Sequence, residues 1–479
     1  MNRRMVIYIL GKMMGVEALL LLLPAGISLI YKEWDGSFFL IPASICLILF
    51  ALFGRKAPAD KVIYGREGML IVAGAWILWS LFGALPFTMS GTIPSYINAF
   101  FETVSGFTTT GSTILVDIES LPKCMAFWRS FTHWIGGMGV LVFVMVLANL
   151  DKKSSMHLLR AEVPGPEKDK LVPKMRQTAR ILYGIYLGLT ALEVIFLLIG
   201  GMNVFDAVLH SFSTAGTGGF SNYNASIAHF NSSYIEWTIT IFMTLFGINF
   251  NMYFLLLLRN FKPVWKNEEL RAYLGIIVAA VAIISFNIYT IYGQDSLRTA
   301  AFQVTSVMTT TGFISADYTT WPMLSQCILL FLMVVGACAS STGGGIKVTR
   351  FLVLLKSIRQ YCRHLIHPKQ VSLIQVSKRT MSSQVLYGVH AYFMSYVAIF
   401  IASVILVSVD NMDFASTLGA VLTCMNNVGP GLGVVGPSGN FSSLSVLSKI
   451  VLSFDMLAGR LEIFPFLLFF NLNAWRKKF

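Results

Sequence analysis

Four short segments with a shared glycine stand out in the sequence, because their residues could coordinate a cation. They read FTTTG, TAGTG, MTTTG and MNNVG, and they end at Gly111, Gly218, Gly312 and Gly429. They recur at intervals of roughly 100 residues, which is the pattern of four similar units around one axis. Glycine allows the backbone angles that align successive carbonyl oxygens, and threonine can add a hydroxyl oxygen. Loops lined with such oxygens can replace the hydration shell of a monovalent cation.

The chain around these segments has the composition of an integral membrane protein. Hydrophobic residues make up 55% of it and charged residues 12%, with a mean hydropathy of +0.69. A soluble globular domain carries about 25% charged residues. Ten apolar runs are long enough to cross a membrane, near residues 5–31, 38–54, 68–90, 123–149, 177–200, 234–258, 272–293, 321–338, 383–409 and 445–472. We predict ten crossings, with the first run kept as a helix and not cleaved as a signal.

Ten crossings would place both termini on the same side of the membrane. Most of the 36 Lys and Arg residues fall in segments on that side, notably within residues 150–180 and 347–379. Cytoplasmic loops carry such an excess of positive charge, so both termini are predicted to be cytoplasmic. The net charge of +13 has the same origin and does not indicate nucleic-acid binding.

A short apolar stretch precedes each glycine segment and lies between two of the longer runs. It cannot span the bilayer, so we predict a re-entrant helix that stops partway and returns as extended chain. The fold class is therefore predicted as an all-α polytopic membrane protein, with four pseudo-symmetric helix/pore-loop/helix repeats around a central pore and two extra N-terminal helices. The predicted units are a two-helix extension (1–67) and pore repeats at 68–176, 177–271, 272–380 and 381–479.

A glycine-rich run interrupts the apolar segment that follows the third glycine segment. It reads GACASSTGGGIK, from Gly336 to Lys347, and includes glycines at 343, 344 and 345. Each glycine disfavours a helix by roughly 1 kcal/mol relative to alanine. One interpretation is a flexible loop that obstructs the pore beneath the third segment. The other is a close crossing of two helices through small residues.

Arg460 lies near the middle of the last apolar run, within FDMLAGRLEIF. A charge at that depth costs about 2.5 to 3.5 kcal/mol, so the side chain should face a cavity or a partner. We interpret it as a barrier or gate on the pore side. The alternative is a structural ion pair with Glu462 or Asp455, although Glu462 is badly placed for a helical pair two residues away.

Two other classes of function have weaker support in the sequence. A membrane enzyme would need a clustered acid, base or metal set, and the six cysteines and seven histidines are scattered without a catalytic or zinc-binding motif. A proton- or sodium-coupled symporter would need carboxylates near the middle of the membrane. Glu17, Glu193 and Glu236 are isolated or lie near the ends of runs.

The four segments together resemble the filter loops of the Trk/Ktr/HKT superfamily of potassium transport proteins. The matching stretches are SGFTTTGST, STAGTGGFS, TTTGF and NNVGPGLG, and the two extra N-terminal runs are similar to those of the bacterial Trk membrane subunits. The resemblance implies potassium uptake across the bacterial inner membrane through a channel-like pore, without enzymatic activity. It implies no organic cofactor in this chain. Rubidium is expected to pass in addition to potassium.

The resemblance also implies partners. Members of this superfamily of the Trk type are expected to form a homodimer in the lipid membrane and to bind a cytoplasmic nucleotide-binding regulatory subunit of the TrkA type. The basic segments 150–180 and 347–379 would offer docking surface for that subunit. No nucleic acid is expected as a partner.

Site residues follow from the same resemblance. The four segment glycines would form one ring, and the run at 336–347 would be the family's intramembrane gating loop. Each segment has one matched glycine where the potassium-channel filter TVGYG has two, so we expect a shorter and less selective filter. The filter would comprise Thr109, Thr110, Gly111, Gly216, Thr217, Gly218, Thr310, Thr311, Gly312, Asn427, Val428 and Gly429, and the gate Gly343, Gly344, Gly345, Lys347 and Arg460.

Overall fold

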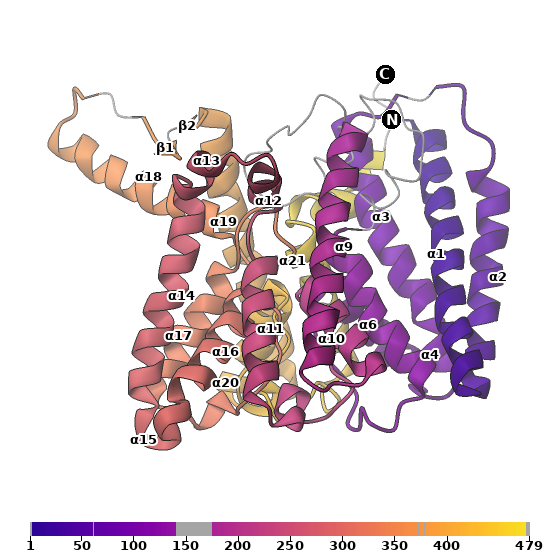
Figure 1. Cartoon of the computed structure of the whole chain (residues 1–479). Coiled ribbons are helices and arrows are strands. Elements are labelled where there is room, and N and C mark those ends of the chain that lie inside the picture. The colour runs from indigo at the N-terminus through magenta and orange to yellow at the C-terminus, as the bar shows by residue number, and fades with distance from the viewer. Residues whose placement is uncertain (1, 61, 140–174, 371–372, 378, 476–479) are drawn as a thin grey trace.

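Helices make up most of the described chain in this computed structural model (Figure 1). The description covers residues 2–60, 62–139, 175–370, 373–377 and 379–475. Most of the predicted basic segment at 150–180 and the end of the predicted run at 123–149 lie outside these residues. Within the described part, a two-stranded antiparallel hairpin, β1 (Gln375–Val376) with β2 (Arg379–Thr380), is the sheet that forms.

The N-terminal extension consists of two helices that pack closely on each other. They are α1 (Arg3–Tyr31) and α2 (Leu40–Leu49), which continues as a π-helical turn at Phe50–Gly54. A Cβ atom on Gly11 would lie 2.7 Å from the backbone nitrogen of Gly54, so only glycine permits this approach. Small residues allow such contacts between membrane helices.

The rest of the chain repeats one arrangement four times: a long first helix, a short helix that stops partway, and a second helix. The first unit contains α3 (Gly65–Gly83), α4 (Leu85–Met89), α5 (Tyr96–Phe107) and α6 (Lys123–Gly137). The second contains α9 (Met175–Ile199), α10 (Val204–Gly216), α11 (Ser233–Phe246), α12 (Phe250–Leu257) and α13 (Phe261–Trp265). The third contains α14 (Glu268–Asn287), α15 (Tyr289–Tyr292), α16 (Ser296–Met308), α17 (Met323–Val335) and α18 (Val348–Ile366). The fourth contains α19 (Ser383–Val407), α20 (Phe414–Asn426), α21 (Val446–Arg460) and α22 (Phe464–Phe470).

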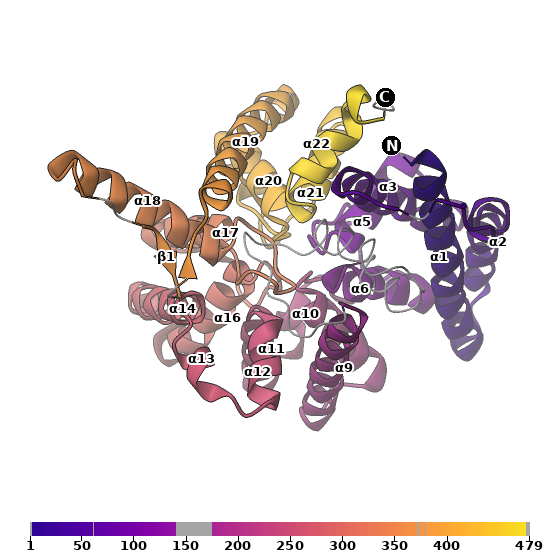
Figure 2. The same cartoon turned by 90° about the horizontal axis from the view of Figure 1, so that it is seen from above.

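The short helices α5, α10, α16 and α20 lie nearer the middle of the molecule than the long helices α9, α14 and α19, as Figure 2 shows. The extension of α1 and α2 lies outside this arrangement, on one side (Figure 2). Side-chain caps fix where several of these elements begin. Asn203 caps α10, Asp413 caps α20 and Ser445 caps α21, each by accepting a backbone N–H hydrogen bond.

Fewer runs form single spanning helices than the sequence predicted. Among the described residues, six helices are long and apolar enough to cross a membrane, and α11 with α12 makes a seventh only as a pair bent by 90°. The difference lies in the second helices α6, α11, α17 and α21. All four end after 13 to 15 residues.

Both ends of the described chain lie at the same end of the molecule (Figure 1). The Arg3 side chain donates from Nε to the carbonyl oxygen of Trp475 at 3.1 Å. The two ends of the described chain are therefore close together, as an even number of crossings would require. Their cytoplasmic location stays a prediction.

Candidate functional site

The chain that leaves each short helix has the same backbone conformation in all four units. We call these segments loop one (residues 108–111), loop two (216–219), loop three (309–312) and loop four (426–429). The second residue of each loop is left-handed, an uncommon conformation for β-branched residues. These residues are Thr109 (φ 55°), Thr217 (54°), Thr310 (59°) and Asn427 (56°). The fourth residue of each loop is a glycine with positive φ: Gly111 (83°), Gly219 (76°), Gly312 (80°) and Gly429 (105°).

The third residue of each loop closes the preceding helix by the same hydrogen bond. Its amide donates to the carbonyl oxygen five residues earlier, a pattern that satisfies an orphan carbonyl at a helix C-terminus. The four bonds are Thr110 to Ser105 (2.9 Å), Gly218 to Ser213 (2.8 Å), Thr311 to Ser306 (2.8 Å) and Val428 to Thr423 (2.9 Å). The loops are therefore equivalent residue by residue.

This equivalence corrects the predicted register of loop two. The sequence predicts Gly218 as the counterpart of the other three glycines, but Gly219 has their conformation, and Gly218 corresponds to Thr110. Gly216 is the last residue of α10. The loop-two segment TAGTGG contains three glycines, and letter matching alone picks the wrong one. The matched residues of loop two are Thr217, Gly218 and Gly219.

The four loops form a closed ring in which glycines alternate with carbonyl oxygens. A Cβ atom on the glycine of one loop would overlap the carbonyl oxygen of the third residue in the next loop. The contacts run in chain order and return to the start: Gly111 with Gly218, Gly219 with Thr311, Gly312 with Val428, and Gly429 with Thr110. Glycine is needed here both for its positive φ and for the space that a neighbouring oxygen takes.

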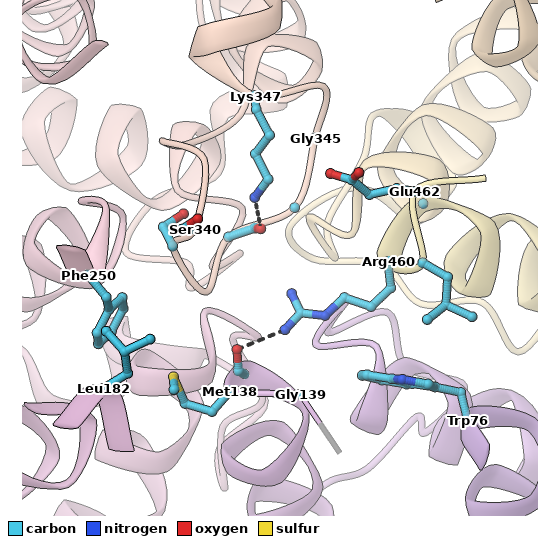
Figure 3. A pocket seen from close by; sticks show the side chains of 16 residues that line it. Trp76, Met138, Gly139, Leu182, Phe250, Ser340, Gly345, Lys347, Arg460 and Glu462 are labelled. Carbon is cyan, nitrogen blue, oxygen red and sulfur yellow. Dashed lines mark hydrogen bonds between the residues drawn. The ribbon is translucent and has the colours of Figure 1, made fainter. Parts of the chain in front are cut away.

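Cavities lie on the two sides of this ring. One, of about 120 Å³, is lined by all four ring glycines together with residues that follow the loops, such as Ser112 and Pro430. The other, of about 80 Å³, is lined by Gly343, Gly344 and Gly345, by Lys347 and by Arg460 (Figure 3). Three predicted filter residues, Gly111, Gly312 and Gly429, thus border the first cavity, and all five predicted gate residues border the second.

Residues 336–347 form a non-helical loop between α17 and α18, which we call the intramembrane loop. Gly336 ends α17 with a φ of 70°. The amide of Gly344 donates to the Thr310 hydroxyl at 2.6 Å, and the amide of Gly345 donates to the carbonyl oxygen of Asn426 at 3.1 Å. The chain here is docked onto loops three and four, which rules out the simple helix crossing considered from the sequence.

Two basic side chains point into the cavity beside this loop (Figure 3). Lys347 is buried, and its ammonium donates to the carbonyl oxygen of Gly343. Arg460 donates to Thr342 in the intramembrane loop at 2.6 Å, and to Gly136 and Gly137 at 2.5 and 3.0 Å. Arg460 therefore ties the fourth unit to the first and the third.

The acidic residues near Arg460 have other bonds. Glu462 forms an ion pair with Arg350 at 2.6 Å. Asp455 accepts a hydrogen bond from Ser403 at 2.8 Å. Backbone carbonyls of two other units are therefore among the contacts that hold the guanidinium of Arg460 in the cavity.

Known proteins resemble this chain over its full length. A family model described as TrkH, a cation transport protein, matches residues 41–477. The Trk system potassium uptake protein TrkH of Salmonella typhimurium is 36% identical over 485 residues, covering all of both chains. The protein of the same name in Escherichia coli K12 is 36% identical over 487 residues, again with full coverage of both. The crystal structure of the potassium transporter TrkH from Vibrio parahaemolyticus matches with a TM-score of 0.88 at 32% identity, over 99% of this chain and 100% of that one.

The chain belongs to the TrkH family. It is accordingly a membrane transport protein, and the all-helical fold class predicted from the sequence is confirmed by the match to a TrkH structure. The residues around the ring have partners that sequence reasoning did not find.

A buried ion pair lies beside the cavity of about 120 Å³ in this TrkH-family protein. Arg129 donates from Nε to Glu102 at 2.6 Å, and the two side chains are 3% and 1% exposed. Glu102 also accepts from the amide of Ile114 at 2.9 Å, and Arg129 donates to the carbonyl oxygen of Ser221 at 3.0 Å. The pair therefore joins the chain that leaves loop one to the chain that leaves loop two.

Glu269 holds the base of the intramembrane loop in a similar way. It is buried at the start of α14, accepts from the amide of Ala339 at 2.6 Å and accepts from the Thr349 hydroxyl. Ala339 and Thr349 lie on either side of the glycines at 343–345 in the sequence. Only the fold brings Glu269 to this loop, since about 70 residues of sequence separate them.

A glycine stands at or beside the end of each of the four second helices of this TrkH-family chain, and in the first and fourth units it lies against the residue that precedes a loop. A Cβ atom on Gly136 would overlap the carbonyl oxygen of Phe107, and one on Gly459 would overlap that of Met425. Phe107 and Met425 are equivalent residues, each just before a loop. The signal was present in the sequence as a glycine near the end of each second helix, at 136–137, 247, 336 and 459.

Proposed function

We propose that this protein carries potassium into the cell through a channel-like pore that passes through the ring of loops. The observation that carries the proposal is the closed cycle of glycines and carbonyl oxygens, with a cavity on each side. Carbonyl oxygens around an axis can replace the hydration shell of a potassium ion. The relatives named Trk system potassium uptake proteins support potassium as the transported ion.

The filter in this proposal consists of the last three residues of each loop. The left-handed second residue turns the backbone, and the third residue contributes the carbonyl oxygen that lies against the next glycine. One such ring gives fewer equivalent binding sites than a channel filter with two glycines per loop. Rubidium should therefore pass with potassium, and some sodium leak is expected. An inside-negative potential would drive uptake by about 2.3 kcal/mol per charge per 100 mV.

The intramembrane loop acts as the gate in this proposal. It occupies the space beneath loops three and four, and its amides bond to Thr310 and Asn426. Lys347 and Arg460 add positive charge in the cavity below the filter. The loop that fills this space and the positive charge beside it both oppose the passage of a cation. Displacement of the loop would remove the steric obstruction.

Regulation is proposed to come from other chains. We infer a homodimer in the lipid of the bacterial inner membrane, with both termini cytoplasmic, that binds a cytoplasmic nucleotide-binding subunit of the TrkA type. Helix α18, which follows the intramembrane loop, projects from the rest of the molecule (Figure 1). Movement of α18 by a partner would act directly on Lys347 and the glycines.

A proton- or sodium-coupled symporter is the second candidate, and buried carboxylates are the observation that favours it. Glu17 in α1 and Glu193 in α9 are fully buried. Glu17 has no hydrogen-bond partner among the described residues. Such groups are costly within a membrane and can mark proton pathways. Both lie outside the ring and the two cavities, so the pore remains the favoured candidate.

Single-channel recording of the purified protein in planar lipid bilayers separates these candidates. A pore gives unitary currents that reverse at the potassium equilibrium potential, with many ions passing per opening. A slow flux without unitary currents, which stops when the proton or sodium gradient is removed, would replace the pore by a coupled transporter. Liposomes without protein are the control.

A further inference from the structure

The eleventh residue of each second helix is methionine in three units and histidine in the first. The four residues are His133 in α6, Met243 in α11, Met333 in α17 and Met456 in α21. All are fully buried. Each methionine shares a hydrophobic cluster with a residue in or beside a loop: Met243 with Phe313, Met333 with Val428, and Met456 with Phe107. The same position in the first unit holds a polar ring.

His133 occupies space that side chains would need in loop two. A Cβ atom on Gly218 would overlap the imidazole, and one on Gly216 would overlap the carbonyl oxygen of His133. Loops one and three have threonine at both equivalent positions, and loop four has Asn426 and Val428. Glycine at position 218 is therefore matched to the imidazole of His133, whereas Gly216 lies against a backbone oxygen that any residue at 133 would present.

The two glycines remove a brace that loops one and three have. In loop one the hydroxyls of Thr108 and Thr110 hydrogen-bond at 2.8 Å, and in loop three those of Thr309 and Thr311 do so at 2.7 Å. Glycines 216 and 218 cannot form this bond. Loop two must take its rigidity from elsewhere.

Phe220, the residue after the loop-two glycine, supplies a contact that replaces this brace. Its ring stacks on His133 with centroids 4.1 Å apart and planes at 14°. The Cζ atom of Arg129 lies 3.6 Å from the same ring centroid. Two groups cannot share one face at these distances, so Phe220 lies between Arg129 and His133, which are one helical turn apart on α6. The contact between a guanidinium and an aromatic ring is stronger when both are desolvated, as they are here.

We propose that His133 is a positioning residue that sets the shape of loop two and, through it, the selectivity of the filter. This inference rests on the proposed function. The carbonyl oxygen that His133 backs is that of Gly218, which lies against Gly111 in the ring. A loosened loop two would let this oxygen move away from the cation and would accommodate sodium more easily.

The test uses the full-length protein in planar bilayers and measures the potassium-to-sodium permeability ratio from reversal potentials. His133→Met copies the residue of the other three units. This variant should still conduct, but its potassium-to-sodium permeability ratio should fall by about tenfold. Removal of supporting groups around a metal site has effects of this size or larger. Gly218→Thr alone should abolish conduction, because its side chain would overlap the imidazole. The double variant should conduct again, since the pairs Met243 with Thr311 and Met456 with Thr110 already coexist in this chain. Gly218→Ala provides a smaller probe of the same overlap.

The control is His390→Met, the same change at an exposed histidine of α19, which should keep the wild-type ratio. An unchanged ratio in His133→Met would overturn the inference, and so would a double variant as inactive as Gly218→Thr. Monodisperse gel filtration establishes that each variant is folded. If the unchanged protein gave no potassium-selective current, the proposed function would fail and this inference with it.

Discussion

The backbone amide of Gly344 donates a hydrogen bond of 2.6 Å to the side-chain oxygen of Thr310. Gly344 belongs to the intramembrane loop, and Thr310 is the left-handed residue of loop three. The proposed gate and the proposed filter are therefore in direct contact, so displacement of the gate must free a threonine hydroxyl of the filter.

Thr310→Val should raise the open fraction. Valine has the shape of threonine, so the left-handed backbone is equally strained, but the Gly344 amide loses its acceptor at a cost of about 1 to 3 kcal/mol in the closed state. Single-channel open probability measures this change. Thr320→Val, at an exposed threonine on the other side of the ring, should leave it unaltered. An unaltered open probability in Thr310→Val would argue against a closing role for this bond.

Arg460→Ala should increase both the open fraction and the conductance. The variant removes the hydrogen bonds to Thr342, Gly136 and Gly137 together with a positive charge in the cavity. Arg460→Lys keeps the positive charge but replaces the planar guanidinium by an ammonium group. Compared with Arg460→Ala, it should restore the barrier to conductance but not all three hydrogen bonds. Reconstituted single-channel recording reads both quantities. If Arg460→Ala behaved like the unchanged protein, Arg460 would have no part in gating.

Gly312→Ala should lower potassium flux by about tenfold or more, because a loss of about 1.4 kcal/mol in cation binding is already a tenfold change. Its methyl group would overlap the carbonyl oxygen of Val428, at a φ of 80°. Rubidium uptake into liposomes measures the flux. Gly275→Ala is the matched control, since Gly275 lies in the helical part of α14 with open space around it. Equal uptake by the two variants would contradict the ring geometry.

Arg129→Met should destabilise the protein by about 3 to 5 kcal/mol, because it leaves Glu102 as an uncompensated buried charge. Glu102→Gln should cost less, since its amide can still accept from the Ile114 amide. The thermal unfolding midpoint, followed by gel filtration of heated samples, reports the order. The double variant Arg129→Met with Glu102→Leu should be more stable than Arg129→Met alone. If its loss of stability equalled the sum of the losses in the single variants Arg129→Met and Glu102→Leu, the two side chains would not be coupled.

The sequence was sufficient for the features that depend on local pattern. Apolar runs, four recurring glycine segments and the glycines at 343–345 are visible without any contact between distant residues. The register of loop two was wrong because three glycines in TAGTGG offer equal matches, and only the backbone angles distinguish Gly219 from Gly218.

Features that depend on contact through space could not be predicted. Near the ends of α6 and α21, the carbonyl oxygens of Phe107 and Met425 occupy the space that a side chain at Gly136 or Gly459 would need. Arg460 was recognised as exceptional from its cost in a membrane, but its carbonyl partners belong to other units. Glu269 lies about 70 residues from the loop that it holds.

The four quarters of the ring belong to one polypeptide, and this has a consequence for how the protein could evolve. A channel built from four identical subunits must accept every substitution four times, at symmetry-related places. Here a histidine at position 133 or an arginine at position 460 is introduced once, while the corresponding residues in the other quarters keep their original roles. Covalent linkage therefore allows a substitution to change one quarter of the ring without being repeated in the other three.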